Sequence, residues 1–209
     1  SDVRNIALVG GPGTGKTTLA EAILHTTGEI ARMGSVADGT TTSDWEADEQ
    51  AKGHSMHLSV LHADHAGLRL HLLDTPGYPD FVGDAACALG AVEVAALCVN
   101  VGEGLTFPGR KSWELTTRTG RARCVVLTHA DQHEFDMVET CHELSEALGA
   151  RCVPAVRPQG TGAAFTGVDI VPLKGGEDAL GEMGEVLLEA VVEVDEAAMM
   201  RFLEEDQPP

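Results

Sequence analysis

A glycine-rich string near the start of the chain has the residue types and spacing of a phosphate-binding loop. It fits the pattern GxxxxGK[ST] and runs Gly10, Gly11, Pro12, Gly13, Thr14, Gly15, Lys16, Thr17. The glycines let backbone N–H groups point inward at a phosphate, and the start of a helix adds partial positive charge there. Lys16 would reach the β- and γ-phosphates, and Thr17 would ligate Mg²⁺. We expect Thr18, the next residue, to belong to the nucleotide-binding site as well. The string predicts a nucleoside triphosphate site and leaves the base open.

A second string, Asp74–Gly77 (D-T-P-G), follows the apolar run Leu68–Leu73. In phosphate-loop enzymes an acid at such a strand end holds the magnesium, usually through water. Gly77 could offer its N–H to a γ-phosphate. Alone, D-T-P-G is an ordinary turn. Its place downstream of the phosphate loop, at the end of an apolar strand, favours the role of Asp74 as a metal-site residue.

Strand-like and helix-like segments alternate through the first 150 residues, which places these strings on strand ends. Alternating apolar residues around Asp64–Gly67 predict a hairpin, and the polar stretch Ser35–Gly53 predicts a long loop. We expect the other strands at Asn5–Val9, Val94–Val99 and Cys124–Leu127, and helices at Lys16–Thr27, Asp80–Ala91, Gly109–Arg118 and Glu134–Leu148. This order predicts an α/β fold of the P-loop NTPase type, with a mostly parallel central sheet and flanking helices.

The character of the sequence changes after Gly149. A loop-rich stretch precedes a short strand predicted at Gly167–Leu173 and an amphipathic helix predicted at Asp178–Leu203. The segment Glu177–Asp206 holds eleven acids and one base. We therefore predict a nucleotide-binding domain over residues 1–150 and a separate part over residues 151–209.

Composition excludes several classes of function. Acids outnumber bases 33 to 14, for a formal charge of −19, so broad binding to nucleic acid backbones is not expected. The longest apolar stretch, Ala85–Val101, is broken by Glu93, so we expect no membrane span. The five cysteines show no CxxC spacing, which predicts buried thiols in a reducing, cytoplasmic compartment.

The chain resembles the translational GTPases of the elongation factor G family, and within them a divergent elongation factor G-like paralogue class. The most specific string is Asp74–Phe81, which resembles the family's D-T-P-G-H-x-D-F; further matching strings are Arg4–Ile6, Thr27–Ile30, Asp38–Trp45 and Val194–Glu204. The resemblance implies Mg²⁺-dependent hydrolysis of GTP to GDP and phosphate, linked to the ribosome. It also implies that residues 151–209 are part of an inserted subdomain whose acidic helix could contact a ribosomal stalk protein. We expect a monomer.

The chain departs from the family pattern in two segments, one expected to bind the metal and one expected to place the attacking water. The first switch segment of the family ends in arginine, glycine, isoleucine and threonine, and here that string is Lys52–Ser55. Ser55 keeps a hydroxyl and is expected to join the metal site, while His54 replaces an apolar gate residue. Tyr78 replaces the histidine that places the attacking water. A phenol is a poor base, so with Lys16, Gly77 and Tyr78 as the catalytic residues we expect slow or differently activated hydrolysis. His54 standing in for that histidine is the alternative.

The guanine-recognition string of the family, N-K-x-D, corresponds here to Thr128–Asp131, T-H-A-D. The resemblance implies that Asp131 selects guanine. Thr128 and His129 depart from the family's asparagine and lysine, but Thr128 can still hydrogen-bond locally and His129 could stack on the base. The family's second guanine-contact loop has no match after Glu204, so we expect the N-terminal GTP-binding fragment of a longer protein.

Three alternatives stay open or are disfavoured at this stage. A regulatory module that binds guanine nucleotide with little or no hydrolysis is the main alternative. An ATPase of another phosphate-loop class would require Asp131 to be coincidental. Zinc binding is disfavoured for the histidines of residues 54–71, which are His54, His57, His62, His65 and His71. No cysteine lies nearby, and solvated histidines of a hairpin explain them more simply.

Overall fold

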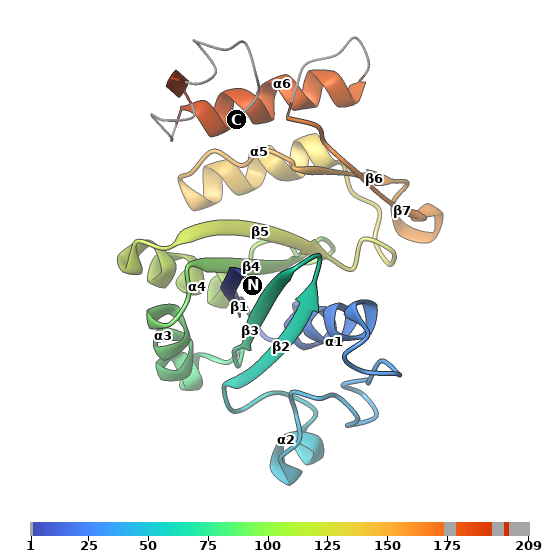
Figure 1. Ribbon diagram of the computed structural model, residues 1–209, viewed down its shortest axis with the longest axis vertical. Coiled ribbons are helices and arrows are strands. Elements are labelled where there is room, and N and C mark those ends of the chain that lie inside the picture. Colours follow the sequence, from blue (N-terminus) through green and yellow to red (C-terminus); the bar gives the residue numbers. More distant parts are fainter. Residues whose placement is uncertain (1, 174–178, 194–198, 201–209) are drawn as a thin grey trace. The chain divides into compact units, whose positions relative to one another are not determined.

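The computed structural model describes residues 2–173, 179–193 and 199–200, and these form two compact units that divide between His129 and Ala130 (Figure 1). The division is one of compactness, and the functional boundary at residue 150 stays a prediction. No helix in the described ranges is long and apolar enough to cross a membrane. Each unit is described by itself.

The first unit is built on a five-stranded sheet in the order β2-β3-β1-β4-β5. Its strands are β1 (Asp2–Val9), β2 (Ser59–His65), β3 (Leu68–Asp74), β4 (Val94–Asn100) and β5 (Ala122–Thr128). Only β2 runs antiparallel to its neighbour, so the sheet is mostly parallel and the α/β prediction is confirmed. Strand β4, which lies between β1 and β5, is buried along nearly its whole length, as expected for a strand covered on both faces.

Helices cover both faces of this sheet (Figure 1). Helix α1 (Lys16–Thr27) lies on one side, and α3 (Val82–Gly90) and α4 (Phe107–Thr119) lie on the other. Ala20 and Leu24 of α1 pack with Leu8, Leu61 and Leu72 in a buried cluster. This packing holds the first turn of α1 at the carboxyl end of β1, where the phosphate loop joins them.

Local capping sets helix boundaries that periodicity alone misplaced. Helix α4 begins at Phe107 rather than at Gly109, because the Thr106 hydroxyl accepts the Gly109 N–H at 3.3 Å. The predicted helix at 80–91 is divided into a short 3₁₀ turn, η1 (Pro79–Phe81), and α3. The long loop contains a short helix, α2 (Ala47–Lys52).

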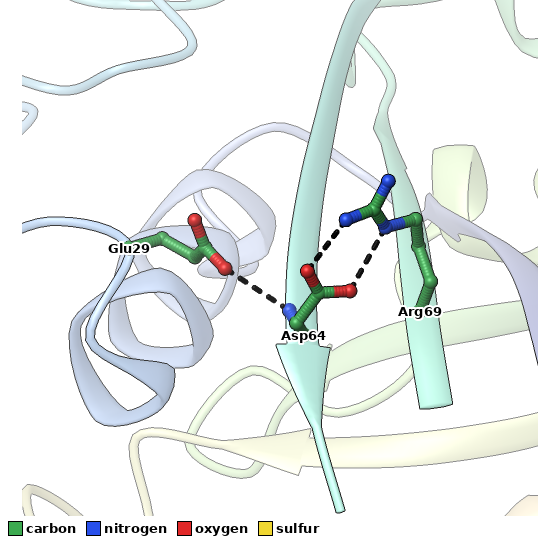
Figure 2. Close-up of polar contacts among 3 residues, drawn as sticks. All are labelled: Glu29, Asp64 and Arg69. Atoms are coloured by element: carbon green, nitrogen blue, oxygen red, sulfur yellow. Dashed lines mark hydrogen bonds and ion pairs between the residues drawn. The ribbon is translucent and has the colours of Figure 1, made fainter. Parts of the chain in front are cut away.

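The hairpin of β2 and β3 turns through Ala66 and Gly67, which both have positive φ. Strand β2 is an edge of the sheet, and its backbone N–H at Asp64 donates to Glu29 Oε1 at 3.1 Å (Figure 2). The Asp64 carboxylate accepts two hydrogen bonds from Arg69, at 2.8 and 2.6 Å, and Arg69 lowers the pKa of Asp64. These charged groups protect part of the edge from pairing with another strand.

The second unit contains α5 (Met137–Leu148), the antiparallel pair β6 (Val156–Gln159) and β7 (Gly167–Ile170), the turn η2 (Gly162–Ala164), and α6 (Ala179–Val192). Helix α5 begins at Met137 rather than at Glu134, because the Asp136 side chain caps it by accepting the Glu139 N–H. Helix α6 ends at Val192, short of the predicted end at Leu203; most of residues 194–203 lies outside the described part of the chain.

All five cysteines are free thiols, but burial is complete only for Cys98. Cys141 and Cys152 are half-buried, and Cys87 and Cys124 are exposed. Burial raises the pKa of Cys98 to about 12, which makes it an inert core residue. The prediction of buried thiols therefore applies to Cys98 alone.

Candidate functional site

The phosphate loop between β1 and α1 depends on glycine at points of close backbone approach. Gly10 has φ +140°, and a Cβ at this position would lie 2.7 Å from the carbonyl oxygen of Cys98. Gly15 has φ +78° and directly precedes α1. The Thr14 hydroxyl donates to the Gly11 carbonyl at 2.9 Å, which closes the loop on itself. The loop therefore has the local geometry that its sequence predicts.

Lys16 extends back over this loop and is buried, with 6% of its surface exposed. Its Nζ donates to the carbonyl oxygens of Gly11 at 2.7 Å and Gly10 at 3.2 Å. Burial lowers the pKa of Lys16, and the charge of Asp74 opposes that shift. The ammonium group thus lies inside the loop, where an anionic phosphate would supply the counter-charge that burial demands.

Two hydroxyls and a carboxylate meet beside the first turn of α1. Thr17 Oγ1 donates to Asp74 Oδ2 at 2.7 Å and lies 3.1 Å from Ser55 Oγ. These are the three residues that the sequence assigned to a metal site, and they come from α1, β3 and the segment after α2. Burial raises the pKa of Asp74 to about 6, against the Thr17 hydrogen bond and the Lys16 charge. Asp74 Oδ1 is buried with no hydrogen-bond partner among the described residues. An unpaired carboxylate oxygen beside two hydroxyls fits a small hard cation such as Mg²⁺.

A second buried carboxylate, Asp44, was missed by the sequence analysis as a site residue. It is 3% exposed, and its Oδ1 also has no hydrogen-bond partner in the described part of the chain. The Asp44 charge contributes to raising the pKa of Asp74 and opposes the lowered pKa of Lys16, so it lies within electrostatic reach of both. Asp44 stood in the quoted string Asp38–Trp45, but nothing in its spacing distinguished it from the other acids of the loop.

The long segment between α1 and β2 is held by two buried glutamates, which the sequence analysis also missed. Glu21 of α1 accepts the backbone N–H of Gly34 at 2.8 Å and that of Thr42. Glu49 of α2 accepts the backbone N–H groups of residues 56 and 57 at 2.8 and 3.0 Å. Both glutamates are 1% exposed. The sequence shows Glu21 as an acid within the predicted helix Lys16–Thr27, and only the structure shows that this position is buried.

The segment after β3 lies directly against the phosphate loop. The Thr75 hydroxyl donates to the Leu8 carbonyl at 2.6 Å. A Cβ on Gly77 would lie 2.6 Å from the Pro12 nitrogen, so only glycine fits there. Tyr78 is 39% exposed, and its ring centroid lies 4.5 Å from that of His54, with the rings inclined at 45°. His54 and Tyr78, which both depart from the family pattern, are therefore neighbours.

On the side expected to hold the base, Thr128 lies at the end of β5 and contacts the phosphate loop. Its hydroxyl is placed to donate to Thr14 O at 3.0 Å or Val99 O at 3.1 Å. His129 has φ +59°, and a Cβ on Gly15 would lie 3.3 Å from its Cε1. Asp131 is exposed in a turn of the second unit.

One cavity of about 370 Å³ in the first unit collects most of these residues. It is lined by Pro12, Gly13, Gly15, Lys16, Thr17, Thr18, Val36, Lys52, Gly53, His54, Ser55, Gly77, Tyr78 and His129. Of these, Val36, Lys52 and Gly53 were not singled out as site residues from the sequence. Within the described ranges, no three His, Cys, Asp or Glu side chains cluster to form a metal site of their own. The hydroxyl groups of Thr17 and Ser55 line this cavity, and the carboxylate of Asp74 lies beside it through its hydrogen bond to Thr17.

Comparison with known proteins matches the chain to the family described as the elongation factor Tu GTP-binding domain, over residues 1–199. The chain is 33% identical to an elongation factor G-like protein of Mycobacterium tuberculosis, over 96% of this chain and 30% of that protein. It is 35% identical to peptide chain release factor 3 of Streptococcus uberis, over 79% of this chain and 33% of that protein. The chain thus spans about a third of the length of these relatives.

Two solved structures have a similar fold. A crystal structure of a protein from Thermus thermophilus superposes with a TM-score of 0.86 at 32% identity, covering 97% of this chain and 33% of that one. A bacterial selenocysteine-specific elongation factor superposes with a TM-score of 0.53 at 22% identity, over 71% of this chain and 23% of that one, which is a likeness of fold alone.

Proposed function

The chain belongs to the family of elongation factor Tu GTP-binding domains, and from this premise we propose that it hydrolyses GTP to GDP and phosphate as part of a ribosome-linked translation factor. The GTP-binding assignment and the elongation factor G-like resemblance made from the sequence are confirmed by the family match and the relatives. We further propose that the chain hydrolyses GTP, binds Mg²⁺ and acts with the ribosome. A monomeric state and a cytoplasmic location also belong to the proposal.

One observation carries the proposal: Lys16, Thr17, Ser55 and Gly77 line a single cavity, and Asp74 hydrogen-bonds to Thr17 beside it. Separate segments of the chain supply them. In phosphoryl transfer, positioning and charge stabilisation provide most of the catalysis, so such a convergence is the central requirement.

The residues have distinct roles in the proposed reaction. Lys16 and the loop N–H groups of Gly10, Gly11 and residues 13–18 stabilise negative charge on the β- and γ-phosphates, while Pro12 has no N–H and contributes to the shape of the loop. Thr17, Ser55 and Asp74 would hold Mg²⁺, which when bound would offset the negative charge of the phosphates. The Gly77 N–H donates to the γ-phosphate. Water attacks the γ-phosphorus in line, and the bond from phosphorus to the bridging oxygen breaks. GDP leaves with that electron pair, and the water proton ends on inorganic phosphate.

Guanine recognition is proposed for the string after β5. Asp131 accepts two hydrogen bonds from the guanine edge, and His129 stacks on the base. Thr128 supports the phosphate loop through the hydrogen bond that its hydroxyl is placed to donate to Thr14. Displacement of labelled GDP by GTP but not by ATP is the result that would exclude an ATPase.

Tyr78 is the observation that favours the second candidate, a guanine-nucleotide-binding module with little hydrolysis. It lines the cavity where the family has its water-orienting histidine, and a phenol is a weak base. A contact between the acidic second unit and a ribosomal stalk protein also belongs to the proposal rather than to the observations.

Single-turnover hydrolysis of GTP with and without ribosomes tests the proposal. We expect hydrolysis by the wild-type chain that is stimulated by ribosomes, and none above background for Lys16→Ala. Arg4→Ala is the matched control, because Arg4 is an exposed cation of β1 that is absent from the cavity lining. Tight GTP binding without hydrolysis, even with ribosomes, would instead support the regulatory module.

A further inference from the structure

The contact between His54 and Tyr78 joins two segments that lie far apart in the sequence. His54 follows α2 at the end of the long loop, and Tyr78 directly precedes η1. Their ring centroids are 4.5 Å apart, within the range of favourable aromatic contacts. Both rings line the cavity that also holds Lys16 and Gly77. Any water beside the terminal phosphate would therefore meet the two side chains as a pair.

Hydrogen bonds hold the chain on both sides of His54; before it, the Gly53 N–H donates to the Glu49 carbonyl oxygen at 2.7 Å. After it, the hydroxyl of Ser55 lies 3.1 Å from Thr17 Oγ1, and Glu49 accepts the N–H groups of Met56 and His57. His54 itself is half-buried rather than free in solvent. Its imidazole is thus attached to a short stretch of chain that is held to both α1 and α2.

Hydrogen bonding at His54 also specifies which ring nitrogen is available. Nδ1 lies 3.4 Å from the carbonyl oxygen of Ser55, and a carbonyl can only accept, so Nδ1 carries the hydrogen of this bond. In the neutral ring, Nε2 then has a free lone pair. A nitrogen of this kind can accept an O–H from water and so direct the water's own lone pair towards phosphorus.

From this geometry we propose that His54 orients the attacking water and that Tyr78 is a positioning residue whose ring holds the imidazole in place. The inference rests on the proposed GTP hydrolysis. Water donates one O–H to Nε2 while its oxygen bonds to the γ-phosphorus. The bond from phosphorus to the bridging oxygen breaks, GDP leaves with that electron pair, and the water proton ends on inorganic phosphate. His54 is unchanged at the end of the cycle.

Single-turnover GTP hydrolysis by the full chain with saturating ribosomes tests this pair, together with the Kd for a fluorescent GTP analogue. His54→Leu should lower the rate about 10- to 100-fold and change the Kd less than about twofold, because it removes a group that acts on water and not on the nucleotide. Tyr78→Leu should lower the rate by a similar factor. Tyr78→Phe retains the ring, so its rate should be at least about fivefold higher than that of Tyr78→Leu. The double variant should be no slower than either Leu variant, since the two side chains act as one unit.

His57→Leu is the matched control, since His57 is an exposed histidine on the same loop and does not line the cavity. It should keep the wild-type rate. His54→Gln retains a hydrogen-bonding side chain and should recover part of the rate, which separates the loss of the polar group from misfolding of the loop.

Three results would overturn the inference. The first is a wild-type rate in His54→Leu. The second is a large loss in Tyr78→Phe with little loss in His54→Leu, which would assign the water to the phenol. The third is a wild-type rate no higher than that of Lys16→Ala, which would also refute the proposed hydrolysis; in the first two cases hydrolysis itself still stands.

Discussion

Replacing Asp74 by asparagine should change how folding stability depends on pH. Burial raises the pKa of this carboxyl from 3.8 to about 6 in the folded protein. The unfolded chain therefore loses its proton first as the pH rises, and the ionised carboxylate penalises the fold. The difference between the pKa of 3.8 in the unfolded chain and the pKa of about 6 in the folded protein corresponds to about 3 kcal/mol of folding free energy. This stability is present below about pH 4 and is lost as the pH rises through about 6. Asparagine cannot ionise, and its oxygen can still accept the Thr17 hydrogen bond.

Urea unfolding of the wild-type chain and Asp74→Asn, between pH 4 and 7.5 without nucleotide and with a chelator, measures this effect. The variant should gain stability relative to wild type by about 3 kcal/mol over that range, because other titrating groups cancel in the comparison. A difference that stays constant with pH, or that shrinks, would refute the assignment of the raised pKa to Asp74. Adding Mg²⁺ and GTP should then stabilise the wild-type chain more than the variant, since a bound cation favours the ionised carboxylate.

Three further outcomes are expected. Tyr78→His should raise single-turnover GTP hydrolysis, since it restores an imidazole where the family carries one; an unchanged or lower rate would contradict this. Asp131→Asn should shift preference from GTP towards xanthosine triphosphate in a competition assay, and an unshifted preference would remove Asp131 from base recognition. Glu21→Ala should lower the free energy of unfolding by about 2–4 kcal/mol and expose the loop to protease, because the N–H groups of Gly34 and Thr42 lose their acceptor. Glu21→Gln keeps one acceptor oxygen, so its free energy of unfolding should lie between those of wild type and Glu21→Ala.

Much of the fold could be predicted from the sequence because its signals are local. The apolar run from Val94 to Val99 lies within β4, and the helix predicted at Lys16–Thr27 was confirmed at both ends. Gly28 explains the second end: it adopts the left-handed conformation that terminates α1, and glycine adopts it without steric cost. Boundaries failed where a side chain overrode periodicity, as Thr106 does for α4 and Asp136 for α5.

The candidate site was predictable only in part, because only some of its residues give a local signal in the sequence. The phosphate loop can be identified from its fixed spacing, since glycines, a lysine and a hydroxyl must follow one another to surround a phosphate. Asp74 can be identified because it begins the D-T-P-G string at the end of an apolar run. Asp44 and Glu49 carry no such spacing. Their importance comes from burial, and a charged group in a polar loop gives no sign in the sequence that folding will bury it.

The sequence by itself determined that this chain is an α/β protein with a phosphate loop, and its matching strings were sufficient to identify a GTP-binding domain. Only the tertiary structure decided which residues act together. It brought Ser55 and Asp74 within hydrogen-bonding distance of Thr17 and placed the ring of His54 against that of Tyr78. Motifs record the order of residues along the chain, whereas catalysis and metal binding depend on distances that arise when separate segments pack on one sheet edge.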